Sequence, residues 1–507
     1  MVMKSQLHCS IFKISKKEAV LWCAFAALLF AAIGCGGGSV ATPPTPGTGM
    51  VTVSISDPPS CMAPNGSSTS FTHVFITVRS VQAHIDPRAD DNSSNWQELA
   101  PQLASQPMQI DLFATPTNCV LAQLGSASLP VGGYQQIRLL LVSNNPAAGA
   151  ATPTKTNNAC AGNGFNCVVL SDNSIHELQL SSQDNTGLKI PPGQILGGPI
   201  QVMAGQSVDL NIDFNACASI VLEGNGTYRL KPTLTAGQVS ADNSGIGGLV
   251  VDSLTKAPIA GKVLVAIEQT DKMGIDRIVM QAAADANGNF RFCPLPTGTF
   301  DIVIDAVNSN NVPYNATVVL NVPNGTNLNT IPLIAETGAT APAVLQGFVT
   351  ATKGTSAATA DVTLAALQTV SPGGTSASRQ ITIPLESIQA IGATPAVDST
   401  ESISVEANTN CPTESPLNAN CKQYTLVVPA SNPNVGVFSS SGVSYTAPAS
   451  GDVLFTVDAQ AFVPMSGGTA DCTPPEVPEA KDTMGQPLKV TAATTTNVAR
   501  IDFSGCS

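Results

Sequence analysis

The sequence predicts an all-β protein, on three observations. Only 11% of the residues are charged, against roughly 25% in ordinary soluble domains, so Ser, Thr, Asn and Gln must cover much of the surface. Gly (42) and Pro (37) are frequent and divide the 507 residues into short segments. Residues 50–57 and 208–214 alternate apolar with polar side chains, the period of a half-buried strand. Strands of this kind pack face to face, so we expect three consecutive β-sandwich domains (Ig-like or transthyretin-like) after an N-terminal signal.

The first element is an export signal. A basic run at 13–17 precedes an apolar run at 19–33, and a small-residue site follows. Residues 32–35, Ala-Ile-Gly-Cys, resemble the bacterial lipobox, although that family prefers Leu where this chain has Ala. The resemblance implies cleavage after residue 34 and attachment of diacylglycerol to Cys35. Gly36 after it implies, by the same family's sorting rule, transfer to the outer membrane.

One alternative for this segment is an uncleaved transmembrane anchor with the same topology. The apolar run is 15 residues long, short of the roughly 20 that span a bilayer. We therefore expect residues 1–34 to be a signal peptide, and Cys35 with the Gly/Pro/Thr-rich residues up to 48 to be a lipidated tether. The protein is then exported and lipid-anchored, in the outer membrane or at the cell surface.

The net charge limits the partners. After removal of residues 1–34 the chain holds 18 basic and 34 acidic residues, a net charge of −16. A negative surface of this kind disfavours nucleic acid and anionic lipid. The expected partners are the membrane through the lipid anchor, together with a glycan or an envelope protein.

Ten cysteines remain once Cys9, Cys23 and the anchored Cys35 are set aside, and in an exported chain they indicate disulfides. Proximity predicts three pairs, which are Cys160 with Cys167, Cys411 with Cys421, and Cys472 with Cys506. Among Cys61, Cys119 and Cys217 we expect two to pair. Cys293 lies in a predicted core strand, as a disulfide partner or as a buried free thiol.

Residues 49–238 form the first predicted module. The inward-facing residues change parity around Arg79 and Ser80, from the set Val74, Ile76 and Val78 to the set Val81, Ala83 and Ile85. One extra residue restores the apolar face, so the pattern predicts a β-bulge there.

The order of segments in this module resembles domain of unknown function 4382, found in bacterial surface lipoproteins. The segments that carry the resemblance are 54–59 (Ser-Ile-Ser-Asp-Pro-Pro), 73–84, 96–99, 109–113, 129–139, 187–189, 209–214 and 228–234. The resemblance implies a β-sandwich of uncharacterised role and transfers no catalytic residue.

Two further modules follow. Residues 245–336 contain an Asn287-Gly288 turn between two alternating strands. With segments 247–253, 257–266 and 295–304, they resemble the carboxypeptidase regulatory-like, transthyretin-type domain. That resemblance implies an accessory seven-stranded sandwich. Residues 340–507 alternate strand patterns with Ser/Thr/Gly/Pro loops and predict a third, disulfide-bonded β-rich domain.

Catalytic motifs are not found in the sequence. His73, His84 and His176 are the histidines of the mature chain, and no Gly-x-Ser-x-Gly motif is present. His176-Glu177 lacks the second His of a zinc protease, and no Cys-x-x-Cys pair indicates a metal site. We expect no catalytic residue, no metal and no cofactor.

Two polar loops could bind calcium through oxygen ligands, but a solvated loop is the better interpretation of each. One contains Asp86, Asp90, Asp91 and Asn95, and the other Asp285, Asn287 and Asn289. Beside the first loop, Trp96 is the aromatic residue least committed to a core, so it is the candidate ligand-binding residue.

These observations favour a non-catalytic envelope lipoprotein that binds carbohydrate or a protein partner. A structural spacer or adhesin stalk is the first alternative. A polysaccharide-acting hydrolase is the second, and it would need two carboxylates facing a cleft.

Overall fold

The computed structural model divides the chain into two units, Met1–Gly47 and Thr48–Ser507. The residues it describes are 47–57, 71–87, 89, 92–114, 119–153, 157–180, 187–190, 194–222, 226–230, 234–239, 245–271, 273–296, 298–371, 378–385, 402–405, 411, 419–462 and 471–506. Among them, strands dominate, with one 3₁₀ turn at Pro101–Ala104 and one four-residue helix, α2, at Ala216–Ser219. The predicted all-β class is confirmed.

The first module packs two sheets on one core. The first sheet has the order β11 (Ile195–Leu196), β16 (Leu234–Gln238), β13 (Ser207–Phe214), β1 (Thr48–Ser56) and β5 (Ala122–Pro130). The second has the order β10 (Leu188–Ile190), β7 (Gln136–Leu141), β2 (Phe71–His84), β8 (Cys167–Leu170), β9 (Ile175–Gln179), β15 (Tyr228–Leu230) and β14 (Ile220–Leu222). β3 (Gln97–Glu98) and β4 (Met108–Asp111) also pair with β2, and β6 (Gly132–Tyr134) pairs with β12 (Ile200–Val202).

The alternating residues predicted to face inward do form this core. Val51, Val53 and Ile55 from β1 and Leu210 and Ile212 from β13 lie in one buried cluster with residues of the second sheet. β1 and β13 run parallel, side by side, although about 150 residues separate them in the chain. The first strand of the module therefore pairs with a strand from near its end.

The predicted β-bulge is confirmed. The register between β2 and β7 shifts between Val78, which faces Leu141, and Ser80, which faces Leu140. The predicted inward side chains on both sides of the shift are buried except Ile85. That part of the prediction was wrong, because β2 ends at His84 and the alternation stops with it.

The second module is built from two groups of strands. One has the order β20 (Asn289–Phe292), β17 (Ile246–Asp252) and β23 (Asn327–Leu333). The other has the order β19 (Ile275–Ala283), β18 (Gly261–Thr270), β21 (Thr299–Asn308) and β22 (Thr317–Pro323). The turn at Gly288 has φ of 82°, and a Cβ there would lie 2.3 Å from the Val250 carbonyl oxygen. Only glycine fits both conditions.

The third predicted module supplies the remaining strands. They are β24 (Ala343–Lys353), β25 (Ser356–Ala357), β26 (Ala360–Val370), β27 (Arg379–Ile383), β28 (Ser402–Val405), β29 (Asn420–Val428), β30 (Asn434–Ser439), β31 (Gly442–Thr446), β32 (Val453–Phe462), β33 (Asp471–Ala480), β34 (Leu488–Val490), β35 (Thr495–Asn497) and β36 (Ile501–Ser504). Their apolar faces meet in one core that includes Leu345, Leu364, Leu426, Phe455 and Phe503.

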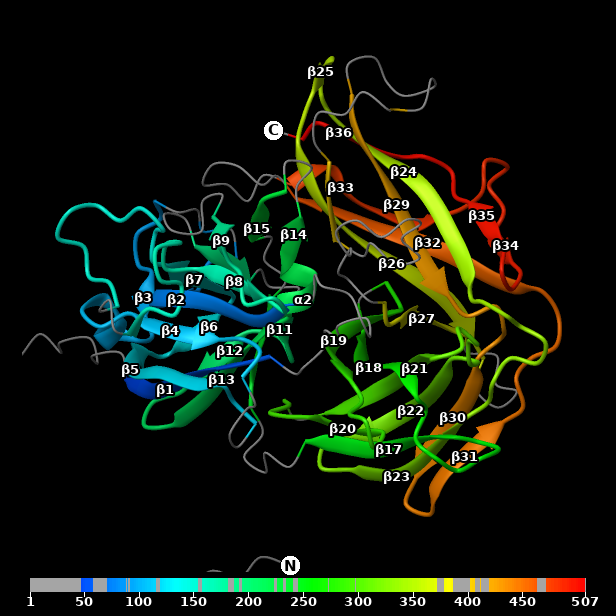
Figure 1. Ribbon diagram of the computed structural model, residues 1–507. Helices are drawn as coiled ribbons and strands as arrows, with labels where there is room; N and C mark the ends of the chain where they lie inside the picture. The colour runs from blue at the N-terminus through cyan, green and yellow to red at the C-terminus, as the bar shows by residue number, and fades with distance from the viewer. Residues whose placement is uncertain are drawn as a thin grey trace, which may run out of the picture. The chain divides into compact units, whose positions relative to one another are not determined.

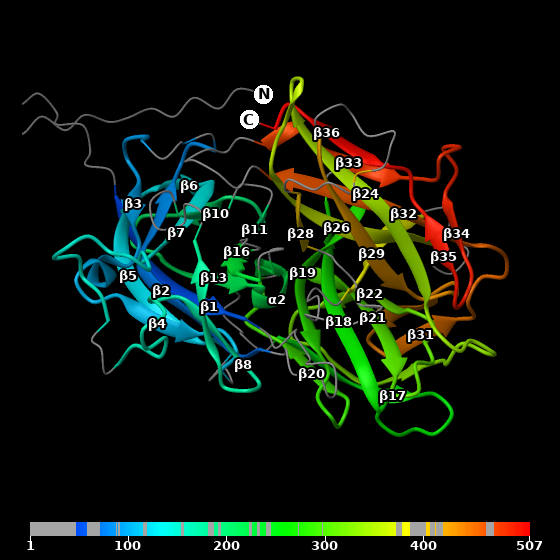
Figure 2. The ribbon, with the colours of Figure 1, turned by 45° about the horizontal axis from the view of Figure 1, so that its top comes forward.

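Strand pairing continues from the second module into the third. β19 pairs in parallel with β27, and β22 pairs in parallel with β30 over Thr317–Leu320. Figures 1 and 2 show the green strands of the second module beside the yellow and orange strands of the third. The sheet hydrogen bonds thus run across the boundary predicted near 336–340, and the module limits themselves stay predictions.

The structure contains the three disulfides predicted by proximity, namely Cys160–Cys167, Cys411–Cys421 and Cys472–Cys506. A fourth joins Cys119 to Cys293 across 174 residues. Cys293 is therefore bonded rather than a free thiol, and Cys119 pairs with neither Cys61 nor Cys217. Cys61 lies outside the described residues, as does the side chain of Cys217.

Replacing Cys119 and Cys293 together by Ala should lower the free energy of unfolding by about 5 kcal/mol, the chain-entropy value for so long a loop. Urea denaturation of the mature chain, with its other disulfides intact, measures this. Replacing Cys160 and Cys167 instead is the matched control, since that bond closes a loop of only 7 residues. A loss no larger than the control's would contradict the prediction.

Candidate functional site

Three aspartates of the first module lie close together although they come from three distant segments. Asp57 follows β1, Asp213 lies on β13 and Asp111 ends β4. The Ser56 hydroxyl donates to Asp213 Oδ1 at 2.8 Å, and the backbone N–H of Ala216 donates to Asp57 Oδ2 at 3.3 Å. Both Asp57 and Asp213 are buried. The cluster therefore places two carboxyls in the interior with few donors to hold their charge.

Burial controls the protonation of this pair. It raises the pKa of Asp213 to about 7. Burial also raises the pKa of Asp57 well above its usual value, and the neighbouring charges of Asp213 and Asp111 raise it further. Desolvation disfavours the charged form, so both carboxyls keep a proton to a higher pH than an exposed aspartate does.

Asp111 and His73 form the more exposed part of the cluster. His73 Nδ1 lies 2.6 Å from Asp111 Oδ2, and Asp111 Oδ1 accepts hydrogen bonds from the backbone N–H groups of Val74 and Phe113. Asp111 orients the His73 ring, but no serine hydroxyl in the described part of the chain contacts that ring, as a hydrolase triad would require.

The family resemblance could have indicated this cluster, whereas strand alternation pointed away from it. The segments with Asp57, Asp111 and Asp213 are three of those that carry the family resemblance. Strand alternation places Asp213 opposite the inward set Val208, Leu210, Ile212 and Phe214, which predicts exposure. The structure buries both faces at this end of β13, so alternation alone could not find the site.

Trp96 lies between a guanidinium group and a second ring rather than alone at the surface. The guanidinium carbon of Arg138 lies 4.1 Å from the centroid of the Trp96 ring, and the His84 ring is 5.1 Å away. His84 is buried and lies between the Ser94 carbonyl oxygen (2.8 Å from Nε2) and the Asp86 N–H (2.9 Å from Nδ1). Trp96 keeps part of its surface exposed, but Arg138 covers one ring face, so stacking on a sugar is limited to the remainder.

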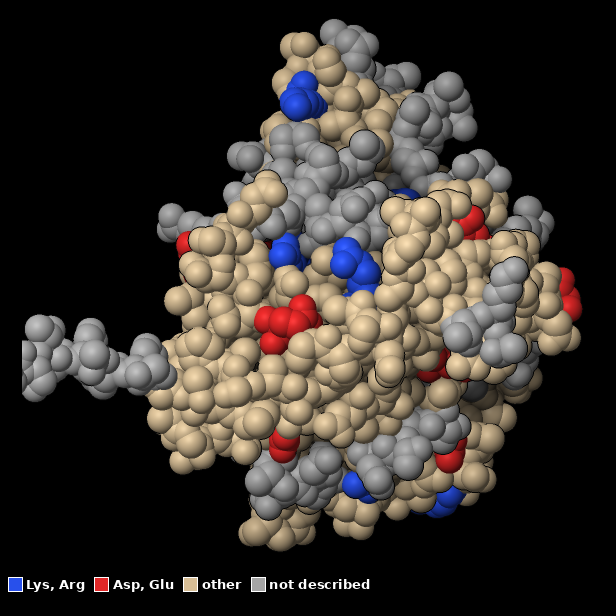
Figure 3. Space-filling model, turned by 90° about the vertical axis from the view of Figure 1, so that its left-hand side faces the viewer, with Lys and Arg blue, Asp and Glu red and all other residues tan. Residues whose placement is uncertain are grey.

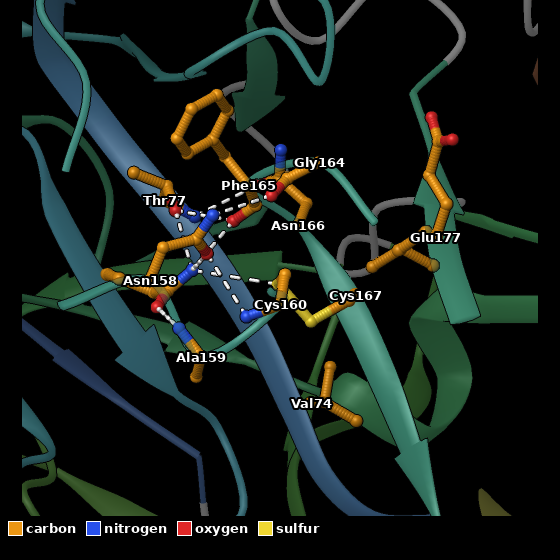
Figure 4. Close-up of a disulfide and its surroundings, with 12 residues drawn as sticks. Val74, Thr77, Asn158, Ala159, Cys160, Gly164, Phe165, Asn166, Cys167 and Glu177 are labelled. Atoms are coloured by element: carbon orange, nitrogen blue, oxygen red, sulfur yellow. Dashed lines mark hydrogen bonds between the residues drawn. A yellow bond between two sulfur atoms is a disulfide. The ribbon is translucent and has the colours of Figure 1, made fainter. Parts of the chain in front are cut away.

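The Cys160–Cys167 disulfide lies within a network of amide side chains (Figure 4). Asn166 is fully buried, accepts from the Thr77 N–H at 2.8 Å and donates to the Val142 carbonyl oxygen at 2.8 Å. Asn158 donates to the Gly164 carbonyl oxygen, also at 2.8 Å. These groups satisfy one another, as buried polar groups must. The network therefore fixes the loop beside β8.

A second group of buried charges lies where the second and third modules share a sheet. Arg277 on β19 contacts three carboxylates: Asp271 at 3.0 Å, Glu476 at 2.6 Å, and Asp458. Burial raises the pKa of Asp458 to about 7, although Arg277 opposes the shift. One guanidinium thus holds together acids from β32 and β33 and the turn before β19.

Beside it lie Glu268 and Asp276, both fully buried. The Thr382 N–H on β27 donates to Glu268 Oε2 at 3.3 Å, and the Thr382 hydroxyl donates to the Asp276 carbonyl oxygen at 2.8 Å. Burial raises the pKa of Asp276 to about 6 and that of Glu268 well above its usual range. Arg379 pairs with the neighbouring Asp301. These acids were not predicted, because no spacing in sequence indicates which strands meet.

The other predicted residues have simpler positions. His176 contacts the Ser174 hydroxyl at 3.0 Å, and that hydroxyl donates to Asp172 at 2.6 Å. The hydroxyl lies between the ring and the acid, so the order differs from a triad. Asp285 accepts from the N–H groups of Asn287 and Asn289 and so holds its turn. Cys35, Asp90 and Asp91 lie outside the described residues.

Within the described part of the chain, no group of three or more His, Cys, Asp or Glu side chains has a geometry suited to a metal ion. In the same residues no helix is long and apolar enough to cross a membrane.

Few charged side chains are visible on the face in Figure 3, in keeping with the low charge content.

Asp213→Asn should flatten the dependence of stability on pH. In the folded protein Asp213 has a pKa of about 7 against an ordinary 3.8. The native state therefore holds one more proton between these values, and the free energy of unfolding falls by about 1.4 kcal/mol per pH unit as pH rises through this window. Urea denaturation at pH 5, 6, 7 and 8 should show a slope smaller by that amount in Asp213→Asn. Asp209→Asn, on the exposed face of the same strand, is the control, and equal slopes in both variants would contradict the assignment.

Arg277→Met should cost about 3 kcal/mol of unfolding free energy at pH 8, because it leaves Asp458 buried without its cation. The loss should be smaller at pH 5, where Asp458 is protonated in both proteins. Lys489→Met removes a solvent-exposed ion pair to Asp452 and should cost less than about 1 kcal/mol. If the two variants lost the same stability, the structural role given to Arg277 would be wrong.

Comparison with known proteins gives one family match. Residues 48–232 match the domain of unknown function DUF4382. No curated protein matches the chain in sequence.

Several solved structures align with the chain at low similarity. The Bacillus anthracis TIE protein aligns at 10% identity over 90% of this chain and 50% of its own, with a TM-score of 0.14. This chain thus spans about half the length of that protein. The shaft pilin SpaA of Lactobacillus rhamnosus GG aligns at 11% identity over 58% and 98% of the two chains, TM-score 0.17. A streptococcal ancillary pilin aligns at 10% identity over 89% and 99%, TM-score 0.15. TM-scores this low carry no argument about topology or role, so the established similarity is that of residues 48–232 to DUF4382.

Proposed function

We propose that this chain is an exported envelope lipoprotein, anchored through Cys35, that acts as a rigid non-catalytic scaffold holding a binding surface near the membrane. The observation that carries the proposal is the cross-linking of its modules. The Cys119–Cys293 disulfide bonds the first module to the second, and parallel strand pairs bond the second to the third. A chain with such links keeps its modules together in an oxidising compartment, where disulfides persist.

The buried acids support a structural role for their surroundings. A polysaccharide-acting hydrolase needs two carboxylates open to a polymer. Asp57 and Asp213 are buried, so they are poorly placed for that reaction. The second module then serves as the accessory carboxypeptidase regulatory-like sandwich that its sequence resembles. An envelope protein is the partner that suits a scaffold of this kind.

Carbohydrate binding is a second candidate, favoured by the position of Trp96. Its ring is partly exposed and is fixed by Arg138 and His84. A preorganised aromatic ring is a common platform for sugar stacking. The ligand would lie on the part of the ring that Arg138 leaves free.

Cys35→Ala should abolish acylation. The wild-type protein, expressed in a bacterial host with labelled fatty acid, should carry the label and fractionate with membranes. The Cys35→Ala variant should carry no label and keep residues 1–34. Cys23→Ala, within the apolar run, is the matched control and should be labelled normally. Label in Cys35→Ala would exclude the proposed anchor.

Trp96→Ala should remove any glycan binding by the fragment Gly36–Ser507 on a glycan array, whereas Trp96→Phe should retain part of it because an aromatic face remains. Circular dichroism checks that both variants fold. Binding that survives in Trp96→Ala would place the glycan site elsewhere. Absence of binding in the wild type would leave the scaffold as the sole candidate.

A further inference from the structure

Four exposed apolar side chains gather at one end of the first module. Met50, Ile85, Val131 and Met203 expose 45%, 54%, 47% and 59% of their surface. They come from four separate segments: β1, the residue after β2, the link between β5 and β6, and the turn after β12. We refer to these four residues as the apolar end.

Short distances and strand register show that the four segments are neighbours. A Cβ on Gly132 would lie 3.5 Å from Ile85 Cγ2, which places Ile85 beside the residue that follows Val131. The antiparallel register of β6 and β12 pairs Gly132 with Val202. Continued by one residue, it sets Val131 opposite Met203.

Met50 joins the group through the turn that contains Met203. The Met50 N–H donates to the Gln206 carbonyl oxygen at 2.9 Å, and the Gly205 N–H donates to the Thr48 carbonyl oxygen at 2.8 Å. The turn at 203–206 therefore lies against the start of β1. Exposed apolar residues are ordinary when scattered, but a group contributed by four segments indicates an interaction surface.

The occupant is indicated by the position of this surface along the chain. Thr48 begins the first strand, and only residues 36–47 separate it from Cys35. Twelve residues span at most about 40 Å. If Cys35 carries the lipid, the bilayer is always within reach of the apolar end, so contact is effectively intramolecular.

We propose that the apolar end docks on the lipid surface to which Cys35 anchors the protein, and so orients the first module on the membrane. This inference rests on the proposed lipid anchor. The neighbouring polar side chains are mainly uncharged: Gln135 donates to the Ile85 carbonyl oxygen, Gln201 lies beside Gly133, and Gln206 precedes β13. Asp86 follows Ile85, and the mature chain has a net charge of −16, so zwitterionic headgroups suit this surface better than anionic ones.

The test uses the mature chain Gly36–Ser507 with an N-terminal hexahistidine tag, tethered to phosphatidylcholine vesicles that contain a little nickel-chelating lipid. Hydrogen exchange is compared between tethered and free protein. Segments 48–51, 84–86, 130–133 and 201–206 should exchange about threefold more slowly, or slower still, when tethered. Trp96 is the one tryptophan left after residue 34 and its ring contacts that of His84, the residue before Ile85, so quenching by brominated phosphatidylcholine gives a second readout.

The variant carries Met50→Ser, Ile85→Ser, Val131→Ser and Met203→Ser together, and it should bind the chelating lipid but lose the protection. The matched control carries Leu254→Ser and Met484→Ser, which change two more exposed apolar residues outside this module, and it should keep the protection. Equal exchange in free and tethered wild type would overturn the proposal. So would protection that appears without vesicles as protein concentration rises, which would indicate a second copy of the chain. Because the tag replaces the lipid, these outcomes do not depend on acylation of Cys35, which the labelling experiment tests separately.

Discussion

The parallel pairing of β19 with β27 and of β22 with β30 is the constraint on which most of the second half of the structure depends. Each pairing joins strands that are more than 100 residues apart in the chain. Backbone groups of the two modules satisfy each other, so neither module has a free edge at these strands. An unpaired strand edge is a site for aggregation, and the shared sheet removes it.

The same pairings explain why acids are buried there. Asp276 faces Ile381 across the β19–β27 pair. The next residue of β27, Thr382, donates hydrogen bonds to Glu268 and to the Asp276 carbonyl oxygen. Once the strands meet, water is excluded, and the carboxyls either bind a cation or retain a proton. Burial raises the pKa of Asp458, Glu268 and Asp276 alike, and the guanidinium groups of Arg277 and Arg379 only partly oppose these shifts. The buried pair in the first module follows the same rule, so acidification from pH 8 stabilises several parts of the molecule at once.

The surface depends on uncharged polar groups more than on charged ones. With 11% charged residues, amide and hydroxyl side chains and backbone turns carry much of the hydration. Several Asp residues, among them Asp252, Asp271, Asp285 and Asp482, cap turns through backbone N–H groups. Their negative charge serves local geometry, and the disulfides among the described residues restrict the unfolded chain. The apolar end stands out against this polar surface because nothing in the described residues covers it.

The sequence by itself determined the strands, the bulge at Arg79–Ser80, the three short-range disulfides and the DUF4382-like order of the first module. The alternation of apolar and polar residues, the turn residues and the proximity of cysteines in sequence are local properties, so they can be identified without a structure. The tertiary structure decided the remaining features. They are the pairing of Cys119 with Cys293, the proximity of Asp57, Asp111 and Asp213, the contacts of Arg277 with three carboxylates, and the grouping of the apolar end. In a β protein the partner of a strand can lie 150 residues away, and burial of an outward-facing residue such as Asp213 depends on what covers that face, which no local pattern records.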